Sequence, residues 1–304
     1  MRVLVTGGSG HIGSAVVPDL LSAGHEVVGL ARSEAAATTL KALGAEARRG
    51  DLDDLDGLRA AASDADGVIH LAFKHDVMYA GDYAAAIEAD LAALEAFGEA
   101  LAGTGKPFVG TSGTVMAAVA GRAGTEDDTL PPGPGLQARA ACENLAVGLA
   151  ARGIRSSVVR LPLTTHSALD RGGFIPTLVA TARTTGVSGY LGDGTNRWPA
   201  VHTLDAARLY RLALEQAPAG SRLHAVADEG VPFRLIAETI GRRLGVPAAV
   251  IPDDEAAAHF GFLAPVVGAD NPATSAHTRA LLGWRPAHPD LIADLGLDHY
   301  FSES

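Results

Sequence analysis

The chain has 304 residues, of which 47% are hydrophobic, and it carries a formal net charge of −11. This length suits one large α/β unit or two unequal lobes, and the acidic balance argues against nonspecific binding to nucleic acid. No apolar run approaches the ~20 residues that a membrane-spanning helix needs, and Met1 leads directly into a strand, so we expect no signal peptide. Cys142 is the only cysteine, which excludes an internal disulfide and fits a reducing cytoplasm.

The first thirteen residues predict a dinucleotide-binding turn. An apolar strand is expected at 3–6; it runs into Gly7, Gly10 and Gly13, and a helix is expected at 12–23. Strand, glycine turn and helix N-terminus together form a site for a pyrophosphate. Gly7 permits the tight turn, Gly10 lets the backbone approach phosphate, and Gly13 lets the helix pack close to the strand. The alternative is an ordinary strand-to-helix turn.

Strands alternate with helices through the first half, which predicts an α/β fold with a doubly wound parallel sheet of the Rossmann type. Further strands are expected at 25–30, 45–49, 67–71, 107–112 and 156–160, with helices at 35–43, 55–62, 83–102 and 137–151. After Pro162 this rhythm breaks, although a helix at 202–215, with Thr203 as a possible cap, and a strand at 223–226 return to the main sheet. An amphipathic helix is expected at 233–244. We therefore expect a Rossmann domain of residues 1–162 and 203–228, and a substrate-binding lobe of residues 163–202 and 229–304.

The end of the second strand predicts the cofactor. NAD-selective Rossmann proteins carry an acid there, which binds the ribose hydroxyls. In this chain Ala31 occupies that position, and Arg32 and Ser33 follow it. A guanidinium can bind a 2′-phosphate through charge-assisted hydrogen bonds, and Ser33 can add a donor. The sequence therefore favours NADP(H), the alternative being that Arg32 is a solvated loop residue.

Seven short motifs occur together in this chain, in a set order and spacing: TGGSGHIG at 6–13, GDL at 50–52, VIHLA at 68–72, TSG at 111–113, RLP at 160–162, VHTLDAARL at 201–209 and LGWRP at 282–286. In these motifs the chain resembles the extended short-chain dehydrogenase/reductase superfamily, close to its atypical, epimerase-like members. The resemblance implies a Rossmann core of seven parallel strands and a small C-terminal substrate lobe. It also implies that Asp51 and Leu52 touch the adenine and that Leu71 and Ala72 lie beside the cofactor. The residues expected to bind the cofactor are Gly7, Gly10, His11, Ile12, Gly13, Arg32, Ser33, Asp51, Leu52, Leu71, Ala72, Arg139 and Leu161.

The catalytic residues depart from what the resemblance implies. The usual chemistry uses a Tyr phenol, a Lys four residues later that lowers its pKa, and a Ser or Thr that ends the fifth strand and binds the reacting oxygen. Ser112 matches the last position, the alternative being a turn serine. Counting back from Glu143, however, places Arg139 where the Lys would stand and Gly135 where the Tyr would stand. Arg139 can bond the nicotinamide ribose, but with a pKa above ~12 it does not easily exchange protons.

Histidines are the candidates to replace the missing phenol, because a histidine near its ordinary pKa can act as an acid at neutral pH. His75 follows the fourth strand, at the cofactor end of the sheet, and His166 follows the sixth strand, where the family builds its substrate pocket. For each histidine the alternative is a structural or surface role. The expected catalytic residues are Ser112, His75, Arg139 and His166, with His75 ranked before His166.

Further along the chain, Phe174, Tyr190, Arg197 and Trp198 suggest an apolar pocket with one cationic handle. No metal-binding pattern appears.

These residues predict a cytoplasmic, NADPH-dependent oxidoreductase that reduces a small carbonyl or imine compound. Imine reduction is included because an iminium ion is already protonated, so its reduction depends less on a Tyr acid. Two alternatives remain: an epimerase or isomerase that recycles its nicotinamide cofactor, and a nonenzymatic NADP-binding regulator. The expected partner is a small-molecule substrate, without nucleic acid or membrane, and the oligomeric state is open, a homodimer being possible.

Overall fold

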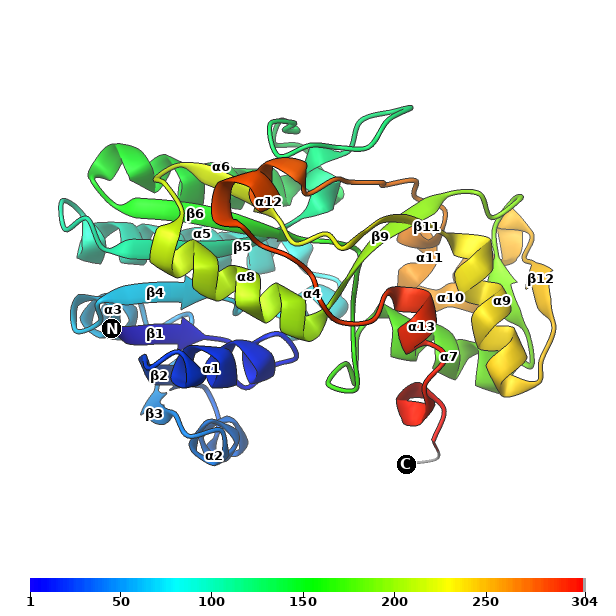
Figure 1. Cartoon of the computed structure of the whole chain (residues 1–304), viewed down its shortest axis with the longest axis horizontal. Coiled ribbons are helices and arrows are strands. Elements are labelled where there is room, and N and C mark those ends of the chain that lie inside the picture. The colour runs from blue at the N-terminus through cyan, green and yellow to red at the C-terminus, as the bar shows by residue number, and fades with distance from the viewer. Residues whose placement is uncertain (303–304) are drawn as a thin grey trace.

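The computed structural model describes residues 1–302, with every side chain among them except that of Leu136. A seven-stranded sheet with the order β10-β6-β5-β4-β1-β2-β3 forms its larger part, and each pair of neighbouring strands is parallel (Figure 1). The strands are β1 Arg2–Thr6, β2 Glu26–Ala31, β3 Glu46–Arg49, β4 Gly67–His70, β5 Pro107–Gly113, β6 Arg155–Leu161 and β10 Ser221–His224. This confirms the expected Rossmann-type α/β fold.

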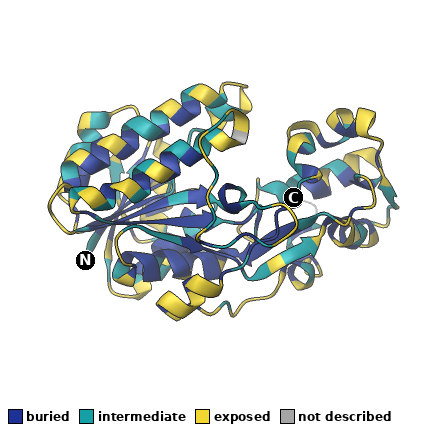
Figure 2. Cartoon of the chain, turned by 90° about the horizontal axis from the view of Figure 1, so that it is seen from above, coloured by how far each residue is buried: buried dark blue, intermediate teal, exposed yellow. Residues whose placement is uncertain are grey.

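Six longer helices cover the two faces of this sheet. Helices α1, α2 and α8 bury their apolar residues on one face, and α3, α5 and α6 do so on the other. Their bounds are α1 Gly13–Ser22, α2 Glu34–Ala42, α3 Leu55–Ser63, α5 Tyr83–Leu101, α6 Arg139–Gly148 and α8 Thr203–Gln216. Figure 2 shows the result: the inner strands are buried along most of their length, the edge strand β3 is not, and the helices are exposed on their outer faces. None of the helices described is long and apolar enough to cross a membrane.

The order of the strands places a binding crevice. The chain runs outward from β1 through β2 to β3 and then returns to place β4 on the other side of β1. Ligands of open α/β sheets bind outside the carboxyl ends of the strands, at the point where the order reverses. The crevice between β1 and β4 therefore receives the turn after β1 and the short helix α4, His75–Tyr79.

A second, smaller group of elements lies beyond the carboxyl edge of the main sheet (Figure 1). It holds a three-stranded sheet in the order β11-β9-β7 and a two-stranded sheet of β12 and β8. Its elements are β7 Thr164–His166, α7 Phe174–Thr185, β8 Ser188–Tyr190, β9 Arg197–His202, β11 Asp228–Pro232, α9 Phe233–Leu244, β12 Ala248–Val250, α10 Ala256–Phe260, α11 Ala264–Val267 and α13 Leu291–Asp294, while α12 Ala276–Leu282 packs beside α8 and β10. The division into two domains at the residues given above stays a prediction.

The expected elements lie close to the observed ones, with two differences. The helix expected at 137–151 is α-helical only over Arg139–Gly148, because a single 3₁₀ turn stands at each end. The N-cap of α8 is His202 rather than Thr203: the His202 side chain accepts the hydrogen bond of the Leu204 amide. The Thr203 hydroxyl is used elsewhere, since it donates to the carbonyl of His166 at 3.1 Å.

Candidate active site

The glycine turn after β1 is a cradle that side chains would fill. Gly7 has a φ of +70°, and a Cβ there would lie 2.7 Å from the amide nitrogen of Ala72. A Cβ on Gly13 would lie 2.2 Å from the carbonyl oxygen of Gly7. Gly13 therefore packs against the turn itself rather than against β1, which corrects the expected reason for this glycine. Gly10 lies between them in the turn, and a Cβ there would lie 3.3 Å from the same oxygen. The turn therefore fits a pyrophosphate at the start of α1.

Two hydrogen bonds fasten the end of β4 to this turn. The amide of Leu71 donates to the carbonyl of Thr6 at 3.2 Å, and the amide of Ala72 donates to the Thr6 hydroxyl oxygen, also at 3.2 Å. Leu71 and Ala72 are half-buried. They thus stand directly beside the cradle, where the resemblance places the cofactor.

A buried chain of polar groups continues from Thr6 to Arg139. Thr6 Oγ1 accepts from Ala72, so its own hydrogen is free to donate to His70 Nδ1, 2.7 Å away. His70 Nε2–H then donates to Asp90 Oδ1 at 3.1 Å, and Arg139 Nη1 donates to Asp90 Oδ2 at 2.8 Å. Burial disfavours the charged carboxylate of Asp90, but the Arg139 charge and the His70 hydrogen bond outweigh it and lower the pKa of Asp90. The chain therefore joins the His70 imidazole to a buried ion pair.

Arg139 is held in place by three contacts. Besides Asp90, its Nη2 donates to the carbonyl of Thr111 at 2.9 Å, and the guanidinium carbon lies 4.4 Å from the centre of the Phe73 ring. These partners fix the guanidinium at the carboxyl ends of β4 and β5. Gly135, where the family phenol was expected, has a φ of +60° and opens the 3₁₀ turn before α6.

Ser112 lies on the α6 side of β5, in a polar environment. Its Oγ is buried beside the Glu143 carboxylate and helps to lower the pKa of that acid, yet it forms no hydrogen bond of ordinary geometry. Burial raises the pKa of Glu143, and the fully buried Arg160 more than offsets this with two hydrogen bonds of 2.9 and 2.6 Å. The Ser112 hydroxyl is thus a buried donor that lacks a partner.

The adenosine end of the crevice is closed by exposed ion pairs. Arg32 donates to Asp76 of α4 at 2.7 Å, with 62% of its side chain exposed, and Lys74 pairs with Asp53. Arg32 thus stands at the end of β2 as expected, but it already has an anionic partner.

The other residues expected at the adenosine end occupy turns. Ser33 caps α2 by accepting from the amide of Ala36 at 3.1 Å. Asp51 accepts from the amide of Asp53, and Leu52 is buried beneath it.

The two ranked histidines have different surroundings. His75 begins α4 and is exposed, with its ring 5.2 Å from that of Phe73. Although the ring is exposed, the protein packed around it, and then the Arg139 charge, lower the pKa of His75. His166 is fully buried; its Nδ1 lies 2.9 Å from Asp294, and its Nε2 has no partner. The structure thus leaves His75 at the crevice and places His166 inside the smaller lobe.

His11 connects the glycine turn to the smaller lobe. Its Nε2 lies 2.8 Å from the Thr203 hydroxyl, and its Nδ1 lies 3.6 Å from Asp170. Burial, and then His166, lower the pKa of His11 to about 4, whereas burial raises the pKa of Asp170 to about 6. Ile12, which follows His11 and is the N-cap residue of α1, is half-buried. Leu161, the last residue of β6, is also half-buried.

The residues expected to form an apolar pocket belong to the core of the smaller lobe. Trp198 is fully buried, and its ring lies between Phe174 and Phe233. Arg197 pairs with Asp270 at 2.8 Å, so the expected cationic handle is engaged within the protein.

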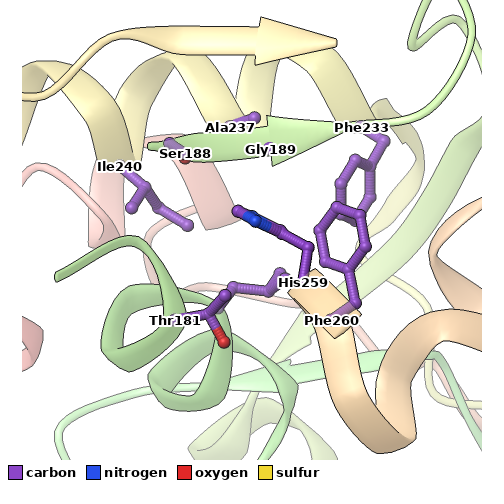
Figure 3. Close-up of a pocket in the computed structure, with 9 residues that line it drawn as sticks. Thr181, Ser188, Gly189, Phe233, Ala237, Ile240, His259 and Phe260 are labelled. Atoms are coloured by element: carbon purple, nitrogen blue, oxygen red, sulfur yellow. The ribbon is translucent and has the colours of Figure 1, made fainter. Parts of the chain in front are cut away.

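A small cavity also lies in this core. Figure 3 shows the His259 ring pointing into it between Phe233 and Ile240. Its volume of about 10 Å³ has room for about one water molecule. This cavity does not hold a substrate. Within residues 1–302, no cluster of three or more metal-ligating side chains could hold a metal ion.

Sequence reasoning missed Asp90 and His70. Asp90 occupies the apolar face of α5, between Ile87 and Leu94. An acid at that helical position is a signal, because a carboxylate seldom lies among buried apolar residues without a partner. His70 lies inside the VIHLA motif, where only the neighbouring Leu71 and Ala72 were considered.

Comparison with known proteins agrees with this geometry. The model of the NAD dependent epimerase/dehydratase family matches residues 3–226. The protein C2A9.02 of Schizosaccharomyces pombe is 46% identical over 99% of this chain and 100% of its own length, and the protein YLL056C of Saccharomyces cerevisiae is 43% identical over 97% and 98%. Among solved structures, MoeE5 in complex with UDP-glucuronic acid and NAD is 25% identical, with a TM-score of 0.77 over 97% of both chains.

Proposed function

The chain belongs to the NAD-dependent epimerase/dehydratase family, and we propose that it is an NADPH-dependent reductase of a small carbonyl or imine compound. One observation carries this proposal: of the two histidines ranked as acids, only His75 stands exposed at the crevice, and His166 is buried against Asp294. Reduction needs one proton donor beside the hydride donor. An epimerase needs two acid/base groups that flank the same carbon atom, and this pair of histidines does not provide them.

NADP(H) is the cofactor that the second strand supports. No carboxylate stands at the end of β2, where Ala31 is buried and Arg32 follows. The carboxylate nearest to Arg32 is Asp76, which comes from α4 rather than from β2. A 2′-phosphate carries more charge than this carboxylate and can replace it as the partner of Arg32. The solved relative MoeE5 is named with NAD, so the preference for NADP(H) is a proposal for this chain.

Each residue then has one task. NADPH supplies the hydride when it is bound. Arg139, fixed by Asp90 and Thr111, places a positive charge beside the reacting end without exchanging a proton. Ser112 donates its unused hydrogen bond to the reacting oxygen or nitrogen. His75, or water near it, delivers the proton.

The test is a pH profile with an assay of product. Purified protein is mixed with NADPH and a panel of aldehydes, ketones and cyclic imines, and loss of absorbance is compared with the reduced product formed. Because His75 must be protonated to act as an acid, kcat/KM falls as pH rises through its pKa, which lies below the usual value. His75→Gln removes this dependence. An unchanged profile in that variant assigns the proton to water or to the substrate.

The two other functions give different results in the same assay. An epimerase consumes no NADPH; it inverts a carbon of its substrate by passing a hydride to the oxidised cofactor and back. A regulator binds NADPH and consumes none with any compound of the panel. Either result contradicts the reductase proposal.

A further inference from the structure

Two exposed aromatic rings meet across the crevice. Tyr79, the last residue of α4, is 54% exposed, and Phe262, from the smaller lobe, is 51% exposed. Their ring centres are 5.2 Å apart, at an angle of 56°. Among the large apolar side chains that the described part of the chain exposes, only these two are aromatic. Tyr79 and Phe262 are thus exposed side by side, one from each lobe, with the exposed ring of His75 beside Tyr79. We call Tyr79 and Phe262 the aromatic clamp.

Further rings continue the clamp on both sides. Tyr79 lies 6.0 Å from His75, and His75 lies 5.2 Å from Phe73. On the other side Phe262 lies 6.4 Å from Phe174, the first residue of α7. The row of rings therefore leads from Phe73 to the smaller lobe. The Arg139 guanidinium lies over the ring of Phe73. The row passes His75, the proposed proton donor.

Two arginines of this region, Arg139 and Arg197, already have anionic partners. Arg139 pairs with Asp90, and Arg197 of β9 pairs with Asp270 through both its side chain and its amide. A diphosphate would have to break these pairs to gain either of the two cations, whereas a flat apolar group needs only the faces of rings. Half-exposed rings gain most from such a partner, because it removes apolar surface from water.

We propose that the substrate carries a flat aromatic group that inserts between Tyr79 and Phe262, with its carbonyl or imine directed toward His75. This inference rests on the proposed reductase function and names the substrate class for it. The two lobes part by the thickness of one ring as the group enters. Stacking between offset rings replaces the contact between the two clamp residues.

Two probes with one carbon skeleton test the inference by binding. Calorimetry of the protein loaded with oxidised NADP, which cannot reduce the probes, measures the Kd of naphthaldehyde and of its saturated decalin counterpart, which is as large but not flat. We expect naphthaldehyde to bind more tightly. Phe262→Leu and Tyr79→Leu each weaken the binding of naphthaldehyde by about 5- to 10-fold, since each variant loses one stacking partner worth ~1 kcal/mol. The Kd of the decalin probe stays within about 2-fold of its value for the unchanged protein. Phe262→Tyr and Tyr79→Phe keep a ring and keep the affinity.

Leu297→Ala is the matched control, since Leu297 is 50% exposed and lies outside the row of rings. Naphthaldehyde that fails to bind, or binds Phe262→Leu as tightly as the unchanged protein, overturns the clamp. Binding that depends on the clamp, together with no turnover of any aldehyde, supports the clamp and contradicts only the reductase function. Equal losses of affinity for both probes would mean that the two rings form only an apolar surface, and this result also overturns the inference.

Discussion

The two ends of the cofactor crevice hold their charges in different ways. At the nicotinamide end, Asp90 is 3% exposed and is shared by Arg139 and His70. At the adenosine end, Arg32 and Asp76 form a pair whose side chains are more than half exposed. A buried pair is costly to break, because the remaining charge has no water to replace its partner. An exposed pair contributes little to stability, and another anion easily replaces its carboxylate. The buried pair thus fixes the position of the Arg139 guanidinium, whereas the exposed pair leaves Arg32 able to exchange Asp76 for an anionic ligand.

The largest expected effect is the loss of the buried carboxylate. Asp90→Ala leaves Arg139 and the Nε2–H of His70 without their acceptor, so we expect the free energy of unfolding to fall by about 3–5 kcal/mol. Urea unfolding measures it. Asp76→Ala, which breaks the exposed pair, is the control and leaves stability unchanged within error. Equal losses in the two variants would remove the difference between the two ends.

Ser112→Ala separates catalysis from stability at the nicotinamide end. If the hydroxyl holds the reacting group, turnover with NADPH falls by about 10- to 1000-fold. Stability changes little, because the buried Oγ of Ser112 has no hydrogen bond of ordinary geometry and the variant loses only its weak interaction with the Glu143 carboxylate. Steady-state rates and urea unfolding of one preparation check both parts. Unchanged turnover would mean that the Ser112 hydroxyl interacts only with the Glu143 carboxylate and not with the substrate.

At the adenosine end, Arg32→Ala tests whether the cation serves the cofactor. A hydrogen-bonded contact with a charged group contributes about 1.5–3 kcal/mol, so NADPH binding weakens by roughly 10- to 100-fold and NADH binding changes little. Asp76→Asn has the opposite effect: it removes the competitor of the 2′-phosphate and tightens NADPH binding by a few fold. Equal changes for both cofactors in either variant would speak against an exchangeable pair.

Asp170 extends the comparison to a buried carboxylate without a strong cationic partner, because His11 beside it has a pKa of about 4 and His166 offsets only a small part of the effect of burial. Burial raises the pKa of Asp170 from 3.8 to about 6. The folded protein therefore binds this proton more tightly, and the contribution to stability is fully present below pH 3.8 and is lost as the pH rises through about 6.

Asp170→Asn removes this dependence. Above pH 6 the variant is more stable than the unchanged protein, by about 1–3 kcal/mol, and the difference disappears toward pH 4 as Asp170 takes up its proton. Urea unfolding between pH 4 and 8 measures the curve. A difference that does not vary with pH would mean that Asp170 is not a buried charge of this kind.

The part of the molecule that the sequence predicts well is the part set by local pattern. Apolar runs predict most strands of the main sheet, the turn at Gly50 marks the end of the polar strand β3, and the expected return of a strand near residue 223 is observed as β10, because period and turn chemistry are local properties. The glycine turn is predicted for the same reason, and Gly7 has the positive φ that its place requires.

The site depends on contacts that no local pattern encodes. Asp90 meets Arg139 from another helix, 49 positions away, and Arg32 meets Asp76 over 44 positions. His166 follows its strand just as the resemblance implies, yet α13 brings Asp294 against it and closes it off from the crevice. Which polar groups meet is decided by the packing of distant elements, so the sequence proposes the candidates and the fold selects among them.

The most direct test of this account is the affinity of the unchanged protein for the two nicotinamide cofactors. Calorimetric titration with NADPH and with NADH, at low and at high salt, measures what the exposed Arg32 contributes. The account predicts that NADPH binds at least ~10-fold more tightly, and that this advantage shrinks as salt screens the exposed cation. Equal affinities for NADPH and NADH at low salt would contradict it.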